Sequence, residues 1–170
     1  MLLKHSLSFL KTSTLFMKFK ILSSILLFIP VLVFAQLKGK VVAVHDGDTF
    51  TLLTSDNKQV KIRLHGIDCP ELSQDFGNVA KQYASSIIFG KIVFVKKVAI
   101  DKYRRTVGIV LLSDSTTLNE KLLLAGLAWH YIKYDKTVKL DSLQNVAKMN
   151  KSGLWKIENP TPPWDYRKHK

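Results

Sequence analysis

Apolar and polar residues alternate along three stretches after position 36, and this period of two is typical of β-strands with one buried face. The stretches cover residues 37–44, 49–53 and 59–67. Two short polar segments, residues 45–48 and 54–58, separate them and are rich in the Asp, Asn, Ser and Gly residues that favour turns. The pattern predicts three strands that follow one another as a meander.

The period changes more than once after the third stretch. Apolar residues between positions 79 and 88 recur at helical spacing up to Gly90, which predicts a helix. Residues 92–98 and 106–112 alternate again and predict two further strands, joined by a charged turn. Helical spacing returns in two segments that each end before a glycine, residues 119–125 and residues 140–151.

Five short strands grouped as three and two, with a helix between the third and the fourth, predict an α+β domain. This order is that of an OB-fold, a five-stranded β-barrel, here with about three helices, that commonly binds nucleic acids or sugars on one face. We assign residues 36–158 to this domain and residues 159–170 to a basic, proline-rich tail. Its three prolines predict an extended backbone, and the charges of residues 166–170 are expected to be solvated.

Residues 1–35 have the pattern of a signal peptide. Four lysines and no acidic residue precede an uninterrupted run of apolar or small residues at positions 21–34, a run too short to cross a bilayer comfortably. Val33 and Ala35 supply small residues at the −3 and −1 positions, so cleavage after Ala35 is expected. An uncleaved anchor is the alternative. The mature protein is therefore expected to be secreted or periplasmic.

Composition indicates a preference for an anionic partner. The chain is 46% hydrophobic and 23% charged, which is typical of a folded globular protein and excludes a disordered or collagen-like chain. Its net charge is +13, and about +9 remains after the predicted cleavage, whether Met1 or Met17 starts the chain. A polyanion such as nucleic acid, or an anionic membrane surface, is therefore the expected partner. A membrane-active protein is disfavoured because the mature part has no basic amphipathic helix.

Three clusters of acids and arginines lie in or beside the predicted turns. They cover residues 46–49 (Asp-Gly-Asp-Thr), 63–71 and 101–105 (Asp-Lys-Tyr-Arg-Arg), and the second opens with an arginine and ends in Asp-Cys-Pro-Glu. Each cluster alone is also typical of an ordinary turn, since Asp-Gly pairs form hairpins and carboxylates beside proline cap turns. Their joint occurrence favours a functional site.

Phosphodiester hydrolysis is the chemistry that suits these residue types. Water must reach a phosphorus shielded by anionic oxygens, which calls for a divalent cation, a base and fixed positive charges. Asp48 and Asp68 are hard oxygen ligands suited to Ca²⁺ or Mg²⁺. Glu71 can act as the general base or orient a metal-bound water. Arg63 and Arg105 present planar forks that can bind phosphate oxygens bidentately.

In the order and spacing of these clusters, residues 38–155 resemble the staphylococcal (micrococcal, thermonuclease) nuclease family. Asn119-Glu120 and Gly126-Leu127-Ala128 extend the resemblance. It implies a Ca²⁺-dependent endonuclease that cuts DNA and RNA with little sequence preference and leaves 3′-phosphate ends. It implies no stable protein partner, so we expect a monomer that does not associate with the membrane after signal cleavage.

The resemblance also implies the ligands of the metal and the base. Asp48 and Asp68 match the family's calcium carboxylates, and Cys69 matches the position whose backbone carbonyl completes the protein ligands. Cys69 stands where the best-known members have threonine, a change that a main-chain ligand should tolerate. Asp46 matches an acid close to the metal that is not usually a direct ligand, and Glu71 matches the proposed general base.

The remaining matches concern the substrate. Arg63 and Arg105 match the two catalytic arginines, and Lys102 and Tyr103 match residues that contact nucleotide phosphate. Arg104 replaces a glycine of the family, which leaves a choice between the two neighbouring arginines, and the spacing of the motif favours Arg105.

Aromatic residues follow the Gly-Leu-Ala segment. Tyr131 and Tyr134 represent the family's paired tyrosines, although in a shifted register, and we assign them a role in base stacking. Trp129, Trp155 and Trp164 are expected to pack within the protein.

A catalytically silent nucleic-acid-binding module with the same barrel is the rival hypothesis. It is disfavoured by the complete set of acids and arginines, which a module that only binds has no reason to keep.

Overall fold

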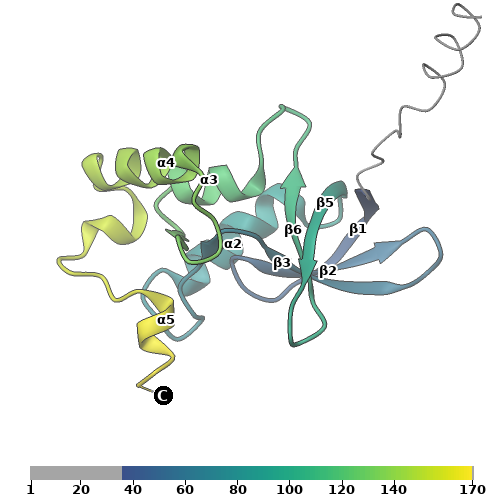
Figure 1. The fold of residues 1–170 in the computed structure, drawn as a ribbon, viewed down its shortest axis with the longest axis horizontal. Coiled ribbons are helices and arrows are strands. Elements are labelled where there is room, and N and C mark those ends of the chain that lie inside the picture. The colour runs from purple at the N-terminus through teal and green to yellow at the C-terminus, as the bar shows by residue number, and fades with distance from the viewer. Residues whose placement is uncertain (1–35, 170) are drawn as a thin grey trace, which may run out of the picture. The chain divides into compact units, whose positions relative to one another are not determined.

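The computed structural model describes residues 36–169. The predicted signal peptide at residues 1–35 and the last residue, Lys170, lie outside the described part (Figure 1). Within residues 36–169, the structure contains no helix with the length and apolar character needed to cross a membrane.

Five strands close into a barrel in the order β1-β2-β3-β6-β5 (Figure 1). Their bounds are Gln36–Val44 for β1, Thr49–Thr54 for β2, Gln59–Leu64 for β3, Ile92–Ile100 for β5 and Thr106–Leu111 for β6. Neighbouring strands are antiparallel, except that β3 and β6 run parallel. The predicted α+β fold with a five-stranded barrel is confirmed.

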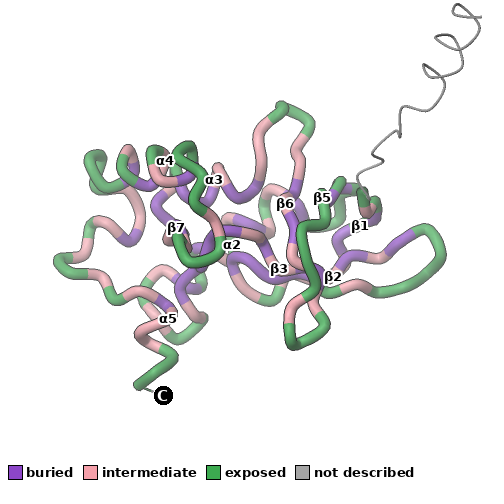
Figure 2. The backbone as a smooth tube through the Cα atoms, viewed as in Figure 1, coloured by how far each residue is buried: buried purple, intermediate pink, exposed green. Residues whose placement is uncertain are grey.

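The alternation seen in the sequence corresponds to the barrel interior. Phe50 and Leu52 of β2, Ile62 of β3 and Val95 of β5 are almost completely buried in one apolar core. Figure 2 shows that buried residues gather in β2 and β3, whereas most of β5 and the tips of the loops are exposed. Removal of this apolar surface from water is the main force that favours the closed sheet.

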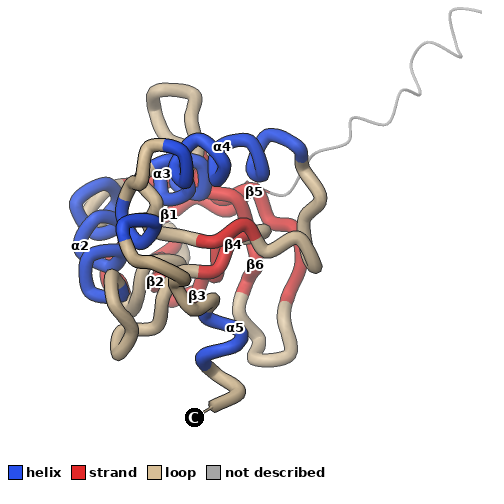
Figure 3. The backbone as a smooth tube through the Cα atoms, turned by 90° about the vertical axis from the view of Figure 1, so that its left-hand side faces the viewer, coloured by secondary structure: helices blue, strands red, loops and turns tan. Residues whose placement is uncertain are grey.

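The three predicted helices correspond to α2 (Gly77–Ile88), α3 (Leu118–Leu124) and α4 (Val138–Met149), with ends that differ by one or two residues from the expected bounds. Helix α3 begins after a capping box, in which the side chain of Thr117 accepts the backbone N–H of Glu120 and that of Glu120 accepts the N–H of Thr117. Figure 3 shows the helices around the barrel strands, and α3 packs against α4.

The predicted end of the third strand is wrong. The sequence pattern runs on to residue 67, but β3 ends at Leu64, and Gly66 with a φ of +70° turns the chain. The short strand β4 (Ile67–Asp68) then pairs with β7 (Trp129–His130) in a separate two-stranded sheet. Only glycine adopts this positive φ without steric cost, so the reversal depends on one residue that alternation does not show.

The tail is not extended as expected. After the 3-10 helix η2 (Gly153–Lys156), residues Pro163–Tyr166 form the short helix α5, with proline at its first turn. The tail also returns to the domain, because the Gln74 amide donates to the Thr161 carbonyl at 3.1 Å and the Tyr166 hydroxyl lies 3.0 Å from the Ser73 hydroxyl.

Gly126 and Gly90 provide a matched test of the packing between the end of α3 and η2. Both have a positive φ, +66° and +75°, but a Cβ at Gly126 would overlap the carbonyl oxygen of Ser152, whereas Gly90 has open space. We expect Gly126→Ala to lower the free energy of unfolding by about 3 kcal/mol. Gly90→Ala, which adds only backbone strain, should cost about 1 kcal/mol. Urea unfolding of both variants measures the difference, and equal losses would contradict close packing at Gly126.

Candidate active site

A pocket of about 750 Å³ lies where the β1–β2 turn, the β3–β4 segment, the β5–β6 turn and the tail meet. The structure brings every predicted site residue to this pocket, although they come from distant parts of the chain. These residues are Asp48, Arg63, Asp68, Cys69, Glu71, Lys102, Tyr103, Arg105, Tyr131 and Tyr134.

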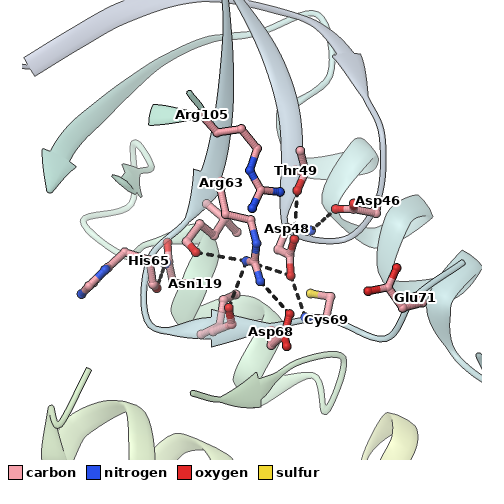
Figure 4. A network of polar contacts seen from close by, with 12 residues as sticks. Asp46, Asp48, Thr49, Arg63, His65, Asp68, Cys69, Glu71, Arg105 and Asn119 are labelled. Atoms are coloured by element: carbon pink, nitrogen blue, oxygen red, sulfur yellow. Dashed lines mark hydrogen bonds and ion pairs between the residues drawn. The ribbon is translucent and has the colours of Figure 1, made fainter. Parts of the chain in front are cut away.

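Asp48 lies in the turn between β1 and β2 and is almost completely buried. The turn is held by Asp46, whose Oδ1 accepts the backbone N–H of Asp48 at 3.0 Å. The Oδ2 atom of Asp48 accepts the backbone N–H of Cys69 at 2.7 Å and lies 2.9 Å from Nη1 of Arg63 (Figure 4). Its Oδ1 accepts the hydroxyl of Thr49. These contacts fix the carboxylate at the base of the pocket.

Arg63 lies at the end of β3 and joins the two buried acids. Its Nη1 also donates to the carbonyls of Leu64 and Ile67, and its Nη2 lies 2.6 Å from Oδ1 of Asp68 (Figure 4). The guanidinium is thus held in one orientation between Asp48 and Asp68. Burial opposes its charge, but the two carboxylates outweigh this effect and raise the pKa of Arg63.

A side chain of α3 holds the turn between Arg63 and Asp68. The side-chain amide of Asn119 donates to the carbonyl of His65 at 2.7 Å, next to Gly66. Asn119 is almost completely buried. The sequence marked Asn119 as a point of family resemblance but not as a residue that positions the site, because its partner lies 54 residues away.

The buried acids at the base of the pocket favour the binding of a cation. Burial raises the pKa of Asp48 and is the largest influence on it; the nearby carboxylates of Asp46 and Asp68 act in the same direction, while the Arg63 guanidinium lowers it. Burial also raises the pKa of the Cys69 thiol well above its ordinary value, so the side chain stays a neutral thiol. Only the main-chain oxygen of Cys69 is therefore suited to bind a cation.

The donor set fits a hard cation held by few protein groups. Within residues 36–169, no three His, Cys, Asp or Glu side chains gather in a metal-binding arrangement. A cation here would therefore rely on the carboxylates of Asp48 and Asp68, a main-chain oxygen and water. Such oxygen ligands suit Ca²⁺ or Mg²⁺ rather than Zn²⁺.

Glu71 lies at the rim of the pocket, in a turn just before α2. Its backbone N–H donates to the side-chain oxygen of Gln74 at 2.9 Å, and its carbonyl accepts the backbone N–H of Gln74. The carboxyl group is about one third exposed, so water can reach it.

The β5–β6 turn presents Arg105. Asp101 accepts the backbone N–H groups of Tyr103 and Arg105 through Oδ1, and its Oδ2 accepts the Nε of Arg105 at 2.7 Å. Arg104 has a φ of +61°, so the turn keeps a left-handed residue where the family resemblance has glycine. Arg105 lines the pocket and points toward Thr49 (Figure 4), whereas Arg104 does not line the pocket.

Aromatic side chains border the pocket on two sides. Tyr103 is exposed and lies beside the charged groups of Lys102 and Arg105. Tyr131 packs edge-on against Tyr134 and stacks on Trp164, with ring centroids 4.8 Å apart in both pairs.

The three tryptophans pack together, as expected. Trp129 meets Trp155 and Trp164 edge to face. Trp164 thereby links this cluster to Tyr131 and brings α5 close to the pocket.

Arg167 is a residue of the pocket that the sequence did not reveal. The expectation that residues 166–170 are solvated is wrong for Arg167, because its Nη2 lies 2.7 Å from Oδ2 of Asp68 and its Nη1 lies 2.8 Å from Oε1 of Glu71. Asp68 and Arg167 are 99 residues apart, and no periodic or motif signal in the sequence connects them.

Comparison with known proteins identifies the family. The staphylococcal nuclease homologue family matches residues 61–157. An uncharacterised endonuclease of Escherichia coli is 41% identical over 136 residues, which cover 80% of this chain and 88% of the relative. The micrococcal nuclease of Shigella flexneri is 30% identical over 156 residues, which cover 86% of this chain and 89% of the relative. The chain therefore belongs to the staphylococcal nuclease family.

Proposed function

We propose that this protein is an exported, Ca²⁺-dependent endonuclease that hydrolyses DNA and RNA phosphodiesters with little sequence preference. Its family and the nuclease names of its relatives support a phosphodiester hydrolase. The observation that carries the proposal is the buried cluster of Asp48, Arg63 and Asp68 at a pocket that Glu71 and Arg105 also line.

Asp48, Asp68 and the backbone carbonyl of Cys69 are the groups that would hold the metal ion. When bound, Ca²⁺ supplies positive charge that polarises the phosphate and favours deprotonation of water. Two carboxylates make a site of low negative charge that is open to water and phosphate. Such a site calls for Ca²⁺ at the millimolar level typical of extracellular proteins.

Glu71 is the base of the proposed reaction. It accepts a proton from the attacking water as the water oxygen bonds to phosphorus. The bond from phosphorus to the 5′ oxygen breaks and the leaving oxygen takes up a proton from solvent water, which leaves a 3′-phosphate and a 5′-hydroxyl. Partial exposure of Glu71 at the rim gives this water access to both the base and the pocket.

Arg63 and Arg105 stabilise the charge that develops on the phosphoryl oxygens. Arg63 is already oriented by Asp48 and Asp68, so little reorganisation accompanies the reaction. Arg105 is oriented in the same way by Asp101. Preorganised donors of this kind account for much of the rate enhancement in many enzymes.

The residues at the rim are suited to contact the phosphate backbone of the nucleic acid and the faces of its bases rather than the hydrogen-bonding edges of the bases. Lys102, Tyr103, Tyr131 and Tyr134 all line the pocket, and we expect the first two to contact phosphate and the two tyrosines Tyr131 and Tyr134 to stack on bases. Phosphate contacts and stacking carry little sequence information, which agrees with broad specificity on DNA and RNA.

Export is the remaining element of the proposal, and residues 1–35 support it through their signal-peptide pattern. The only cysteine, Cys69, is buried, and the fold therefore does not depend on oxidation for its stability. Mass spectrometry of the mature protein should find Gln36 as its first residue.

Arg63→Lys and Glu71→Gln test the chemistry. Lysine keeps the charge but loses the planar fork, and glutamine keeps the shape but loses the base, so each should lower the saturating rate by roughly a hundredfold or more. Substrate affinity should change far less, because a cation still meets the phosphate. Saturation kinetics on plasmid DNA and RNA measures both parameters.

Lys61→Gln is the control for these variants, since Lys61 is an exposed residue of the same strand as Arg63. It should keep the parent's rate. Circular dichroism and thermal melting establish that each variant is folded. If folded Arg63→Lys and Glu71→Gln proteins both cleave at the parent's saturating rate, the assigned site is wrong and a module that only binds nucleic acid becomes the better hypothesis.

Metal removal tests the cofactor. Cleavage should stop in EDTA and return with Ca²⁺ at about millimolar concentration, because the site has only two carboxylate ligands. Asp48→Asn should raise the Ca²⁺ required for half-maximal cleavage at least tenfold or so. Asp56→Asn, which changes an acid in the β2–β3 turn that pairs with Lys58, should leave the requirement unchanged. Full cleavage in EDTA, or rescue by Zn²⁺ alone, would refute a calcium site.

A further inference from the structure

The tail brings a second guanidinium to Asp68. The Nη2 atom of Arg167 lies 2.7 Å from Oδ2 of Asp68, and its Nη1 lies 3.3 Å from Oδ1 of the same carboxylate and 2.8 Å from Oε1 of Glu71. One side chain therefore bridges the proposed metal ligand and the proposed base. Arg63 binds Asp68 as well, through Oδ1 at 2.6 Å.

The contact is supported by the surrounding structure. Arg167 directly follows the short helix α5, whose Tyr166 hydroxyl lies 3.0 Å from the hydroxyl of Ser73. On the other side of α5, Trp164 stacks on Tyr131 with an angle of 16° between the rings. These two anchors place the guanidinium over the pocket and reduce the entropy lost when it binds the carboxylates.

Charge balance explains why a cation is favoured at this position. Five acidic residues line the pocket. Arg105 pairs with Asp101, and Arg63 lies between Asp48 and Asp68. The Asp68 side chain is only 2% exposed, and a buried carboxylate without enough positive charge is costly. Burial opposes the charge of Arg167, but its hydrogen bonds to Asp68 and Glu71 prevail and raise its pKa.

A metal ion and Arg167 compete for the carboxylate oxygens of Asp68. Arg63 and Arg167 already contact Oδ1, and Arg167 also contacts Oδ2. Arg63 is buried and holds Oδ1, so Oδ2 is the oxygen left for a divalent cation, which would lie within a few ångströms of the more exposed Arg167 guanidinium and repel it strongly. Metal binding must therefore weaken or break the contact between the tail and Asp68.

We propose that Arg167 is an internal counter-cation of the metal site, which pairs with Asp68 and Glu71 in the metal-free protein and which the metal ion has to displace. The inference rests on the proposed function, because it requires Asp68 to be a metal ligand. The family match ends at residue 157, so Arg167 lies outside the matched segment. Displacement would also free Glu71 from its ion pair at the moment the metal binds.

Calcium titration of the metal-free protein by calorimetry tests this proposal directly, without relying on cleavage. Arg167→Gln removes the competing charge, and we expect its dissociation constant for Ca²⁺ to fall about tenfold relative to the parent. Arg167→Lys keeps the charge and should stay closer to the parent than Arg167→Gln does. Lys168→Gln is the matched control, because Lys168 is the neighbouring cation but pairs with Asp165. It should bind Ca²⁺ within about twofold of the parent.

A melting experiment gives a second, independent measurement. Without metal, Arg167→Gln leaves Asp68 and Glu71 short of a partner, so its midpoint should lie below that of the parent. Saturating Ca²⁺ should raise the midpoint of Arg167→Gln by more than it raises that of the parent, since tighter binding stabilises more.

The outcomes separate the two proposals. If the parent binds Ca²⁺ and Arg167→Gln binds it equally or more weakly, the counter-cation role is wrong while the calcium site stands. If neither protein binds Ca²⁺ or shifts its midpoint with it, the calcium site fails and the role of Arg167 fails with it.

Discussion

The ion pairs of Arg63 with Asp48 and Asp68 are the constraint on which the arrangement of the pocket depends. Each of the three groups is largely removed from water, and each would be costly to bury without the others. The guanidinium also donates to two carbonyls, so its orientation is fully determined. Through these contacts Arg63 of the barrel fixes both the β1–β2 turn and the separate strand β4. Arg63 also keeps the two carboxylates apart, because both bind to it.

Local patterns in the sequence were sufficient to place the barrel strands, and the pocket residues could be predicted from their turn chemistry together with the order of the motifs in the family. The period of two placed all five barrel strands, and the Asp-rich turns at Asp46 and Asp101 could be recognised because each of these aspartates binds backbone within a few residues of itself. The end of β3 could not be predicted in this way. Its alternation continues past Gly66, and the break is held by Asn119 and by pairing with β7, which are both distant in the sequence.

The role of the tail could not be predicted for the same reason. Prolines and basic residues occur both in solvated tails and in tails that pack against the domain. Composition does not show which side chains a charged residue will contact. Arg167 and Lys168 are neighbouring basic residues in the sequence, but Arg167 pairs with acids at the pocket, whereas Lys168 pairs with the nearby Asp165. Only the folded structure reveals that the sequence-distant Asp68 has room for a second guanidinium.

The parallel pairing of β3 with β6 has a consequence for how the pocket comes into being. Residues 36–71 carry both buried aspartates, Arg63 and Glu71, yet Arg105 is brought beside them only when β6 adds to β3, with Arg63 opposite Val107. Strand pairings between distant segments tend to form late, because chain entropy is lost before the contacts repay it. The two arginines therefore meet only on a closed barrel, and a chain synthesised only as far as β5 holds the acids without a complete reaction centre.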